Sequence, residues 1–272
     1  MPGFDELLRL AEATALAAAE HLLAETGRGD LEVASKATGT DLVTKVDRSC
    51  EQLIVDRITE HRPRDGIVAE EGTAIMGESG VDWLIDPLDG TTNYVYQHPG
   101  FSVSIAASVD GVPTIGVIAD PLHGQLFSAR LGGGATCNGE PIRCSELTQL
   151  DKALVATGFA YDPPTRRLQA EALTSVLPEI RDIRRMGGAA VDLCSVACGR
   201  VDAFFERGLQ PWDYAAGSVI ASEAGARVGD LDGGPPSAGC CLAAPPSLFE
   251  SLATLLATAT ATAVEGPPII ER

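Results

Sequence analysis

Apolar residues recur at two different spacings along the chain, and the change of spacing outlines the predicted elements. A repeat of about three to four residues, often in alanine- and leucine-rich stretches, predicts helices at residues 5–25, 41–61, 163–177, 189–198, 218–226 and 248–264. Short apolar runs of β-prone residues predict strands at residues 67–69, 81–85, 101–109, 112–119, 126–130, 135–137, 153–158, 182–186 and 201–206.

The order of these elements divides the chain into two halves. Up to about residue 145, hairpin-forming strands follow helices, which predicts helices packed on a largely antiparallel sheet. From about residue 150 onward, strands and helices alternate, as is typical of an α/β unit. We therefore predict a mixed α/β fold with an N-terminal half of residues 1–145 and a C-terminal half of residues 150–272.

The stretch VDWLIDPLDGTTN, residues 81–93, carries the densest candidate chemistry. Pro87 should end the regular strand and place Asp86 and Asp89 on a tight turn at its carboxyl end, where open α/β sheets bind ligands. Gly90 and Thr91 follow, with a flexible backbone, a hydroxyl and unpaired N–H groups. Carboxylates attract a hard cation such as Mg²⁺, while N–H groups attract an anion. The stretch suits a metal-bound phosphate, although Asp-Pro and Asp-Gly are also common in plain surface turns.

Other acidic residues lie at the ends of predicted elements, and each has a simpler structural interpretation as well. The Glu70-Glu71 pair closes a short strand and could be a solvated loop. Asp47 stands near a helix start, where it favours the helix dipole, and Asp213 is placed to cap a helix. Glu206 ends a strand and could simply be exposed.

Composition and charge limit the classes of partner. Lys and Arg number 20 against 38 Asp and Glu, a net charge of −18, so we expect no non-specific binding to nucleic acid or to an anionic membrane. The charge allows a phosphorylated substrate if a metal ion supplies positive charge. The sequence shows no obvious basic cluster, which disfavours doubly phosphorylated substrates.

The chain shows no signal-peptide pattern at its start, and residues 248–264 have helical leucine spacing, which predicts a packed terminal helix rather than a membrane span. The seven cysteines form no Cys-x-x-Cys motif. Cys194 and Cys198 are one helical turn apart but have no nearby histidine, so we interpret them as small buried thiols rather than metal ligands. Reduced thiols favour a cytoplasmic protein.

Residues 83–93, WLIDPLDGTTN, resemble a signature of the inositol monophosphatase family, Mg²⁺-dependent and typically lithium-sensitive phosphatases. WDYAAG at residues 212–217 resembles the second family signature, preceded by Pro211 where the family usually has a small residue or cysteine. Lys36, Asp41, Thr44 and Asp47 resemble a further element, and Glu70-Glu71 the family's Glu-Glu pair. The matches occur in the family's order from about Lys36 to Ala226.

The resemblance implies a layered α/β/α/β/α sandwich of the inositol monophosphatase and fructose-1,6-bisphosphatase type, with the site between the two halves, and a homodimer. It also implies two or three Mg²⁺ ions per site. The implied metal ligands are Glu70, Asp86, Asp89, Asp213 and the Leu88 carbonyl. No cluster of histidines and cysteines recruits zinc instead, and the all-oxygen set suits Mg²⁺.

The remaining site residues follow from the same resemblance and from the chemistry of hydrolysis. Glu70, Thr91 and Asp47 would orient the attacking water and help to deprotonate it, and the N–H groups of Gly90 and Thr91 would hold the phosphate. Lys36 would lie on a loop near the site.

By the same resemblance, residues matching Asp89, Gly187, Ala189 and Glu206 contact the substrate. A carboxylate at position 206 can accept hydrogen bonds from a polyol, which favours inositol 1-phosphate. Histidinol phosphate is the main alternative, because a carboxylate also binds an ammonium group. Fructose 1,6-bisphosphate and 3′-phosphoadenosine 5′-phosphate are further alternatives.

A different functional class is a non-catalytic regulatory protein of the same fold. Such a protein is expected to lack a metal ligand or Thr91, whereas this sequence retains Thr91 and all four carboxylate ligands.

Overall fold

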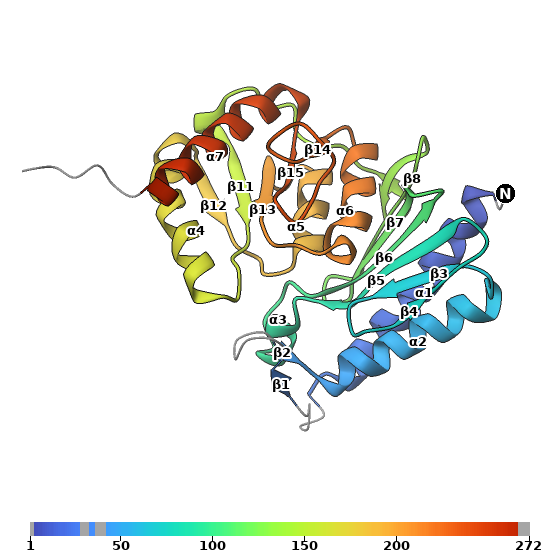
Figure 1. The fold of residues 1–272 in the computed structure, drawn as a ribbon. Coiled ribbons are helices and arrows are strands. Elements are labelled where there is room, and N and C mark those ends of the chain that lie inside the picture. The colour runs from blue at the N-terminus through green and yellow to red at the C-terminus, as the bar shows by residue number, and fades with distance from the viewer. Residues whose placement is uncertain (1–2, 28–32, 36–41, 266–272) are drawn as a thin grey trace, which may run out of the picture.

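Two β-sheets alternate with three layers of helices in the computed structural model, which describes residues 3–27, 33–35 and 42–265 (Figure 1). Helices α1 and α2 cover the outer face of the larger sheet, α5 and α6 lie between the sheets, and α4 and α7 cover the far face of the smaller sheet. The predicted mixed α/β sandwich is therefore confirmed.

The helices follow the predicted periodicity closely, except that the short helix Thr91–Val95 was not predicted and two others start at different residues. Their bounds are α1 Phe4–Glu25, α2 Lys45–His61, α3 Thr91–Val95, α4 Pro163–Val176, α5 Ala189–Ala197, α6 Pro211–Glu223 and α7 Pro246–Glu265, with short 3-10 turns at Leu150–Lys152 and Leu177–Glu179. Helix α2 starts at Lys45 rather than at residue 41, because Leu42–Val43 pairs as a strand and Thr44 caps the helix. Helix α6 starts at Pro211 rather than at residue 218, since proline suits the first helical position.

The larger sheet has eight strands in the order β10-β9-β8-β7-β6-β5-β3-β4. All neighbours are antiparallel except β3 and β5, which are parallel, so the prediction of a largely antiparallel sheet is confirmed. The strands are β3 Gly66–Ala69, β4 Ala74–Ile75, β5 Val81–Asp89, β6 Ser102–Val109, β7 Val112–Asp120, β8 Gln125–Arg130, β9 Gly134–Cys137 and β10 Glu140–Pro141. A separate pair joins β1 Ala34–Ser35 to β2 Leu42–Val43.

The smaller sheet has five strands in the order β12-β11-β13-β15-β14. They are β11 Leu154–Thr157, β12 Asp182–Arg184, β13 Ala203–Glu206, β14 Arg227–Gly229 and β15 Cys241–Ala244. The sequence pattern missed β14 and β15, because each is short and flanked by glycine- and proline-rich segments. The predicted division near residues 145–150 falls between the two sheets, and the assignment of both halves to one compact unit stays a prediction.

Hydrophobic side chains pack in three clusters, one for each layer of helices. Helix α1 buries Leu7, Ala11, Ala15 and Leu22 against the larger sheet, at the three- to four-residue spacing that the sequence shows. Within the described residues, α7 is the one helix long and apolar enough to cross a membrane by length and composition. Its leucines, Leu248 and Leu252 among them, are buried in the cluster beside the smaller sheet, as predicted for a packed terminal helix.

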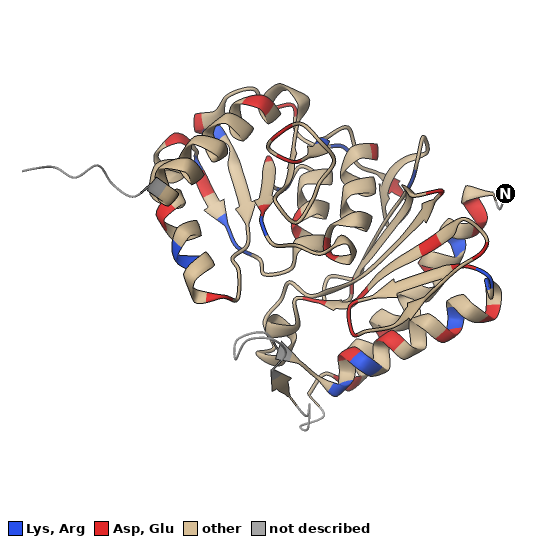
Figure 2. Ribbon diagram, in the orientation of Figure 1, with Lys and Arg blue, Asp and Glu red and all other residues tan. Residues whose placement is uncertain are grey.

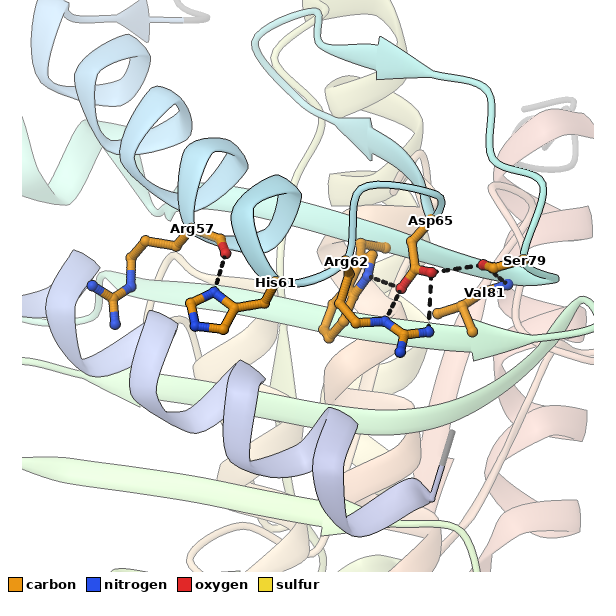
Figure 3. Close-up of polar contacts among 7 residues, drawn as sticks. Arg57, His61, Arg62, Asp65, Ser79 and Val81 are labelled. Carbon is orange, nitrogen blue, oxygen red and sulfur yellow. Dashed lines mark hydrogen bonds and ion pairs between the residues drawn. The ribbon is translucent and has the colours of Figure 1, made fainter. Parts of the chain in front are cut away.

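A buried carboxylate joins the end of α2 to the larger sheet (Figure 3). Asp65 is 4% exposed and accepts hydrogen bonds from the Arg62 guanidinium at 2.9 and 3.1 Å. Ser79 Oγ at 2.6 Å and the Trp83 indole N–H at 3.0 Å donate to the same carboxylate. These bonds fix the first half of β5, and therefore the direction in which its acidic end points.

Candidate active site

Strand β5 carries two aspartates at its carboxyl end, where its pairing becomes irregular. Asp86 pairs with Ser104 and Asp89 with Ser102, and the register shifts between them. We predicted that Pro87 would end the ladder; instead the strand bulges over Pro87 and Leu88 and pairs again at Asp89. A bulge re-aims side chains next to a site, because it inserts an extra residue opposite the partner strand.

The turn after β5 opens directly into a short helix. Gly90 has φ 85°, a left-handed conformation that favours glycine, and Thr91 begins α3. Asn93 donates from its side-chain amide to the carbonyls of Gly100 and Met186, at 2.8 and 2.7 Å. This amide therefore holds the turn against the other half of the chain, a structural role that the sequence did not predict.

Asp89 is fixed by the first turn of α5, which lies 100 residues further along the chain. Its carboxylate accepts hydrogen bonds from the Ala189 N–H at 3.2 Å and the Ala190 N–H at 2.9 Å. A Cβ at Gly188 would lie 2.7 Å from the Asp89 carboxylate, so only glycine permits this approach. The Gly187-Gly188 corner thus presents the N-terminus of α5 to a protein carboxylate.

Asp47 and Thr91 meet beside the turn. Asp47 Oδ2 accepts from the Thr44 N–H at 2.8 Å and from Thr44 Oγ1 at 2.5 Å, a capping box at the start of α2. Asp47 Oδ1 accepts from Thr91 Oγ1 at 3.0 Å, and Thr91 Oγ1 also lies 3.1 Å from the Leu88 carbonyl oxygen. The helix-start interpretation of Asp47 is thus correct, and the residue also reaches the site.

Asp213 enters the site from the first turn of α6. Its Oδ2 accepts from the Gln210 N–H at 2.6 Å, the capping role that the sequence suggested. Ser104 on β6 donates to the Trp212 carbonyl at 3.2 Å, which ties this helix start to the larger sheet. Gly217 lets α6 pack closely on α5, since a Cβ there would lie 2.5 Å from the Leu193 side chain.

Glu70 follows β3 on a turn that is held from behind by α2. Buried Glu51 accepts hydrogen bonds from the Glu71 N–H at 2.7 Å and the Thr73 N–H at 3.1 Å. The Thr73 hydroxyl donates to Glu51 as well, at 2.6 Å. Sequence analysis missed Glu51, whose only signal was a charged residue on the apolar side of a predicted helix.

One cavity gathers these elements. Its lining includes ten residues that the sequence named for the site: Glu70, Asp86, Leu88, Asp89, Gly90, Thr91, Gly187, Ala189, Glu206 and Asp213. Asp47 reaches it through Thr91, while Lys36 and Asp41 lie outside the described residues. Phe159, Tyr161, Arg185 and Leu209 also line the cavity and were not foreseen. The roles assigned to all these residues stay predictions.

Burial and mutual repulsion raise the pKa values of the carboxyl groups in this cavity. Burial holds the pKa of Asp86 well above its ordinary value, and the nearby Glu70, Asp89 and Asp213 add to the rise. Burial raises the pKa of Asp89 to about 7, although the α5 N–H groups act against it. Burial likewise raises the pKa of Asp213 to about 8, against the bond from Gln210. A cation bound in this cavity would therefore stabilise the ionised form of these carboxyl groups.

The donors in the cavity fit Mg²⁺ by their chemistry. Four carboxylates and the Leu88 carbonyl are hard oxygen donors, and no histidine or cysteine is among the described lining residues. No group of three or more Asp, Glu, His or Cys side chains in the described chain is already gathered as a metal centre. The carboxylates repel one another, so the fit to a cation rests on donor type and electrostatics rather than on preformed coordination.

Comparison with known proteins agrees with this picture. The sequence model of the inositol monophosphatase family matches residues 4–261. An inositol-1-monophosphatase of Mycobacterium bovis is 45% identical over 216 residues, 76% of this chain and 74% of that protein. The Nus factor SuhB of Escherichia coli is 42% identical over 207 residues, 75% of this chain and 78% of that protein.

A solved structure shares nearly the whole fold. The extragenic suppressor protein suhB from Bartonella henselae superposes with a TM-score of 0.88 at 35% identity. The match covers 92% of this chain and 98% of that one.

Proposed function

The chain belongs to the inositol monophosphatase family, a family of phosphatases, and we propose that it hydrolyses a small phosphate monoester with Mg²⁺, inositol 1-phosphate being the simplest substrate. The observation that carries this proposal is that Glu70, Asp86, Asp89, Asp213 and Glu206 line one cavity. The first four suit cations and a phosphate, and the last suits a polyol.

Mg²⁺, at two or three ions per site, would be held by Glu70, Asp86, Asp89, Asp213 and the Leu88 carbonyl. When bound, it would lower the pKa of the attacking water and stabilise the leaving oxygen. The N–H groups of Gly90 and Thr91 would donate hydrogen bonds to the phosphate oxygens.

Thr91 and Asp47 would handle the proton of the attacking water together with Glu70. A hydroxyl has one hydrogen, so Thr91 Oγ1 can donate to Asp47 or to the Leu88 carbonyl, but not to both. When it donates to Asp47, its lone pairs are free to accept a hydrogen bond from water. Asp47 thus orients the threonine, and the threonine orients the nucleophile.

Recognition of the alcohol would fall to Glu206, with Asp89, Gly187 and Ala189 around it. Burial raises the pKa of Glu206 to about 7; Arg185 lowers it and Asp89 raises it further. Near neutral pH this carboxyl group can accept or donate a hydrogen bond, which suits the hydroxyls of a polyol. The same group could bind the ammonium of histidinol phosphate, which keeps that substrate as the alternative.

The test is phosphate release by the purified protein with Mg²⁺ from inositol 1-phosphate, histidinol phosphate, fructose 1,6-bisphosphate and 3′-phosphoadenosine 5′-phosphate, with and without lithium. We expect hydrolysis of inositol 1-phosphate, inhibited by lithium and strongly reduced in Glu206→Gln. Preference for histidinol phosphate would overturn the substrate but keep the metal chemistry. Turnover by Asp89→Asn within a few fold of wild type would contradict the ligand assignment.

The competing functional class is a non-catalytic regulatory protein. The absence of phosphate release from all four substrates would favour it. The retained Glu70, Asp86, Asp89, Thr91 and Asp213 support an enzyme instead. We also expect the protein to be cytoplasmic and to form a homodimer. Sedimentation of the purified protein would check the dimer.

A further inference from the structure

A second cavity opens outward from the active-site cavity. The two share Phe159, Tyr161, Arg185 and Gly187, so they are direct neighbours. The outer cavity is larger, about 710 Å³ against about 120 Å³ for the inner one. An alcohol too large for the inner cavity would therefore extend into the outer one.

The charge changes sign between the two cavities. Five carboxylates line the inner cavity, from Glu70, Asp86, Asp89, Glu206 and Asp213. No Asp or Glu is among the described residues that line the outer cavity, whereas Arg166 and Arg185 both are. Basic residues are sparse over the whole ribbon (Figure 2), so two guanidinium groups at one cavity of a chain with net charge −18 are unusual.

Neither guanidinium group forms an ion pair with a carboxylate of the described chain. Within the described chain, no carboxylate oxygen lies within 4.0 Å of either one, whereas neighbouring Arg184 forms an ion pair with Asp182 at 2.7 Å. Arg185 acts on Asp89, Asp192 and Glu206 only at longer range, and Arg166 acts in the same way on Asp162. Because a guanidinium presents five N–H donors in a planar fork, an unpaired pair of arginines matches the oxygens of a phosphate.

We propose that Arg166 and Arg185 form an anion subsite in the outer cavity, and that the favoured substrate is a polyol phosphate whose alcohol carries a second phosphate. The first phosphate would lie among the inner carboxylates and be hydrolysed, while the second would lie between the two arginines. This inference rests on the proposed function and narrows its substrate class. It reverses the sequence-based expectation that the absence of a basic cluster disfavours such substrates.

The experiment compares substrates that differ only by the second phosphate, using the full-length chain with Mg²⁺. The pairs are myo-inositol 1-phosphate with myo-inositol 1,4-bisphosphate, and fructose 1-phosphate with fructose 1,6-bisphosphate, which separate their phosphates by different distances. For each pair the ratio of kcat/KM values is measured, and NMR identifies which phosphate leaves. We expect at least one pair to favour the bisphosphate by about tenfold or more, as charged hydrogen bonds would give.

Variants then locate the source of this preference. The ratio should fall towards one in Arg166→Gln and in Arg185→Gln, and high salt should reduce it in the wild type. Arg167→Gln is the matched control, since Arg167 is an exposed neighbour on α4 that lines neither cavity.

The outcomes separate the two proposals. Failure to hydrolyse any of the four compounds would overturn the proposed function itself. Hydrolysis of the monophosphates with ratios near one, or a ratio that Arg166→Gln leaves intact, would overturn the anion subsite alone.

Discussion

Thr91 Oγ1 lies 3.0 Å from Asp47 Oδ1, although 44 residues separate the two in the chain. The contact joins the turn after β5 to the first turn of α2, and it fixes the threonine hydroxyl at the candidate active-site cavity. Two elements that are each explained by local sequence thus meet in one hydrogen-bonded pair, to which we assign the handling of the water proton.

Removing this hydroxyl should slow catalysis strongly. We expect Thr91→Val to lower kcat by about 10²- to 10⁴-fold, the usual contribution of a positioned acid–base group, with a smaller loss in Asp47→Asn. Thr91→Ser keeps the hydroxyl and should retain most activity. Steady-state kinetics on inositol 1-phosphate would check this, and near-wild-type kcat in Thr91→Val would remove Thr91 from the mechanism.

Glu51 should act on the metal site through the turn that carries Glu70. Because Glu51 accepts from the N–H groups of Glu71 and Thr73, Glu51→Ala should release this turn and raise the Mg²⁺ concentration for half-maximal activity about 10- to 100-fold. Glu60→Ala, at an exposed position on the same helix, is the control. An unchanged Mg²⁺ requirement in a folded Glu51→Ala variant would show that the turn holds its shape without Glu51.

Asp65 should contribute to the stability of the fold and not to catalysis. Replacing it by asparagine weakens the bonds from Arg62, Ser79 and Trp83, and we expect a loss of about 2 kcal/mol in the free energy of unfolding at pH 7. The exposed Arg64–Glu78 pair, 3.6 Å long, gives a control, because Glu78→Ala should change stability little.

The effect of Asp65 should depend on pH in a fixed direction. Burial acts to raise its pKa, but hydrogen bonds from Arg62, Ser79 and Trp83 outweigh it and lower the pKa below the ordinary 3.8. A lowered pKa stabilises the fold above pH 3.8, and this stability is lost as the pH falls through the folded-state value. Urea unfolding at pH 7 and pH 3 should therefore show a smaller difference between wild type and Asp65→Asn at the lower pH.

The metal-free protein should lose stability as the pH rises. Burial, with Glu206 and Asp89 nearby, raises the pKa of Asp192 to about 8, and burial raises that of Glu206 to about 7. A raised carboxyl pKa favours the folded state at low pH, and this contribution is lost between the unfolded value near 4 and the folded value near 8.

Urea unfolding in EDTA would measure this loss, which should be roughly 5 kcal/mol between pH 5.5 and pH 8.5, since one pKa unit is worth about 1.4 kcal/mol. Asp192→Asn should flatten the profile, because its amide has no charge to bury. Asp151→Asn, at an exposed position, should not. A wild-type stability that stays level or rises over this range would contradict the raised pKa values that burial gives these carboxyl groups.

Local sequence determined much of the fold and the identity of the site. The alternation at residues 81–85 predicted β5, the alanine and leucine spacing predicted α1, and the acidic residues at element ends marked Glu70, Asp86, Asp89 and Asp213. These features are readable because a periodic pattern reports which face of an element is buried, and a residue at a strand or helix end has few local roles.

Tertiary structure decided how those elements meet, which no local pattern encodes. The bond from Ala190 to Asp89 spans 101 residues and depends on Gly188 leaving room for the carboxylate. Arg166 and Arg185 belong to separate segments, and only the packing of α4 beside the Gly187 corner places both at one cavity. The sequence determined which charged groups were present. Long-range packing of the backbone determined which of them would share a cavity, because electrostatic interactions depend on distance in space rather than on separation along the chain.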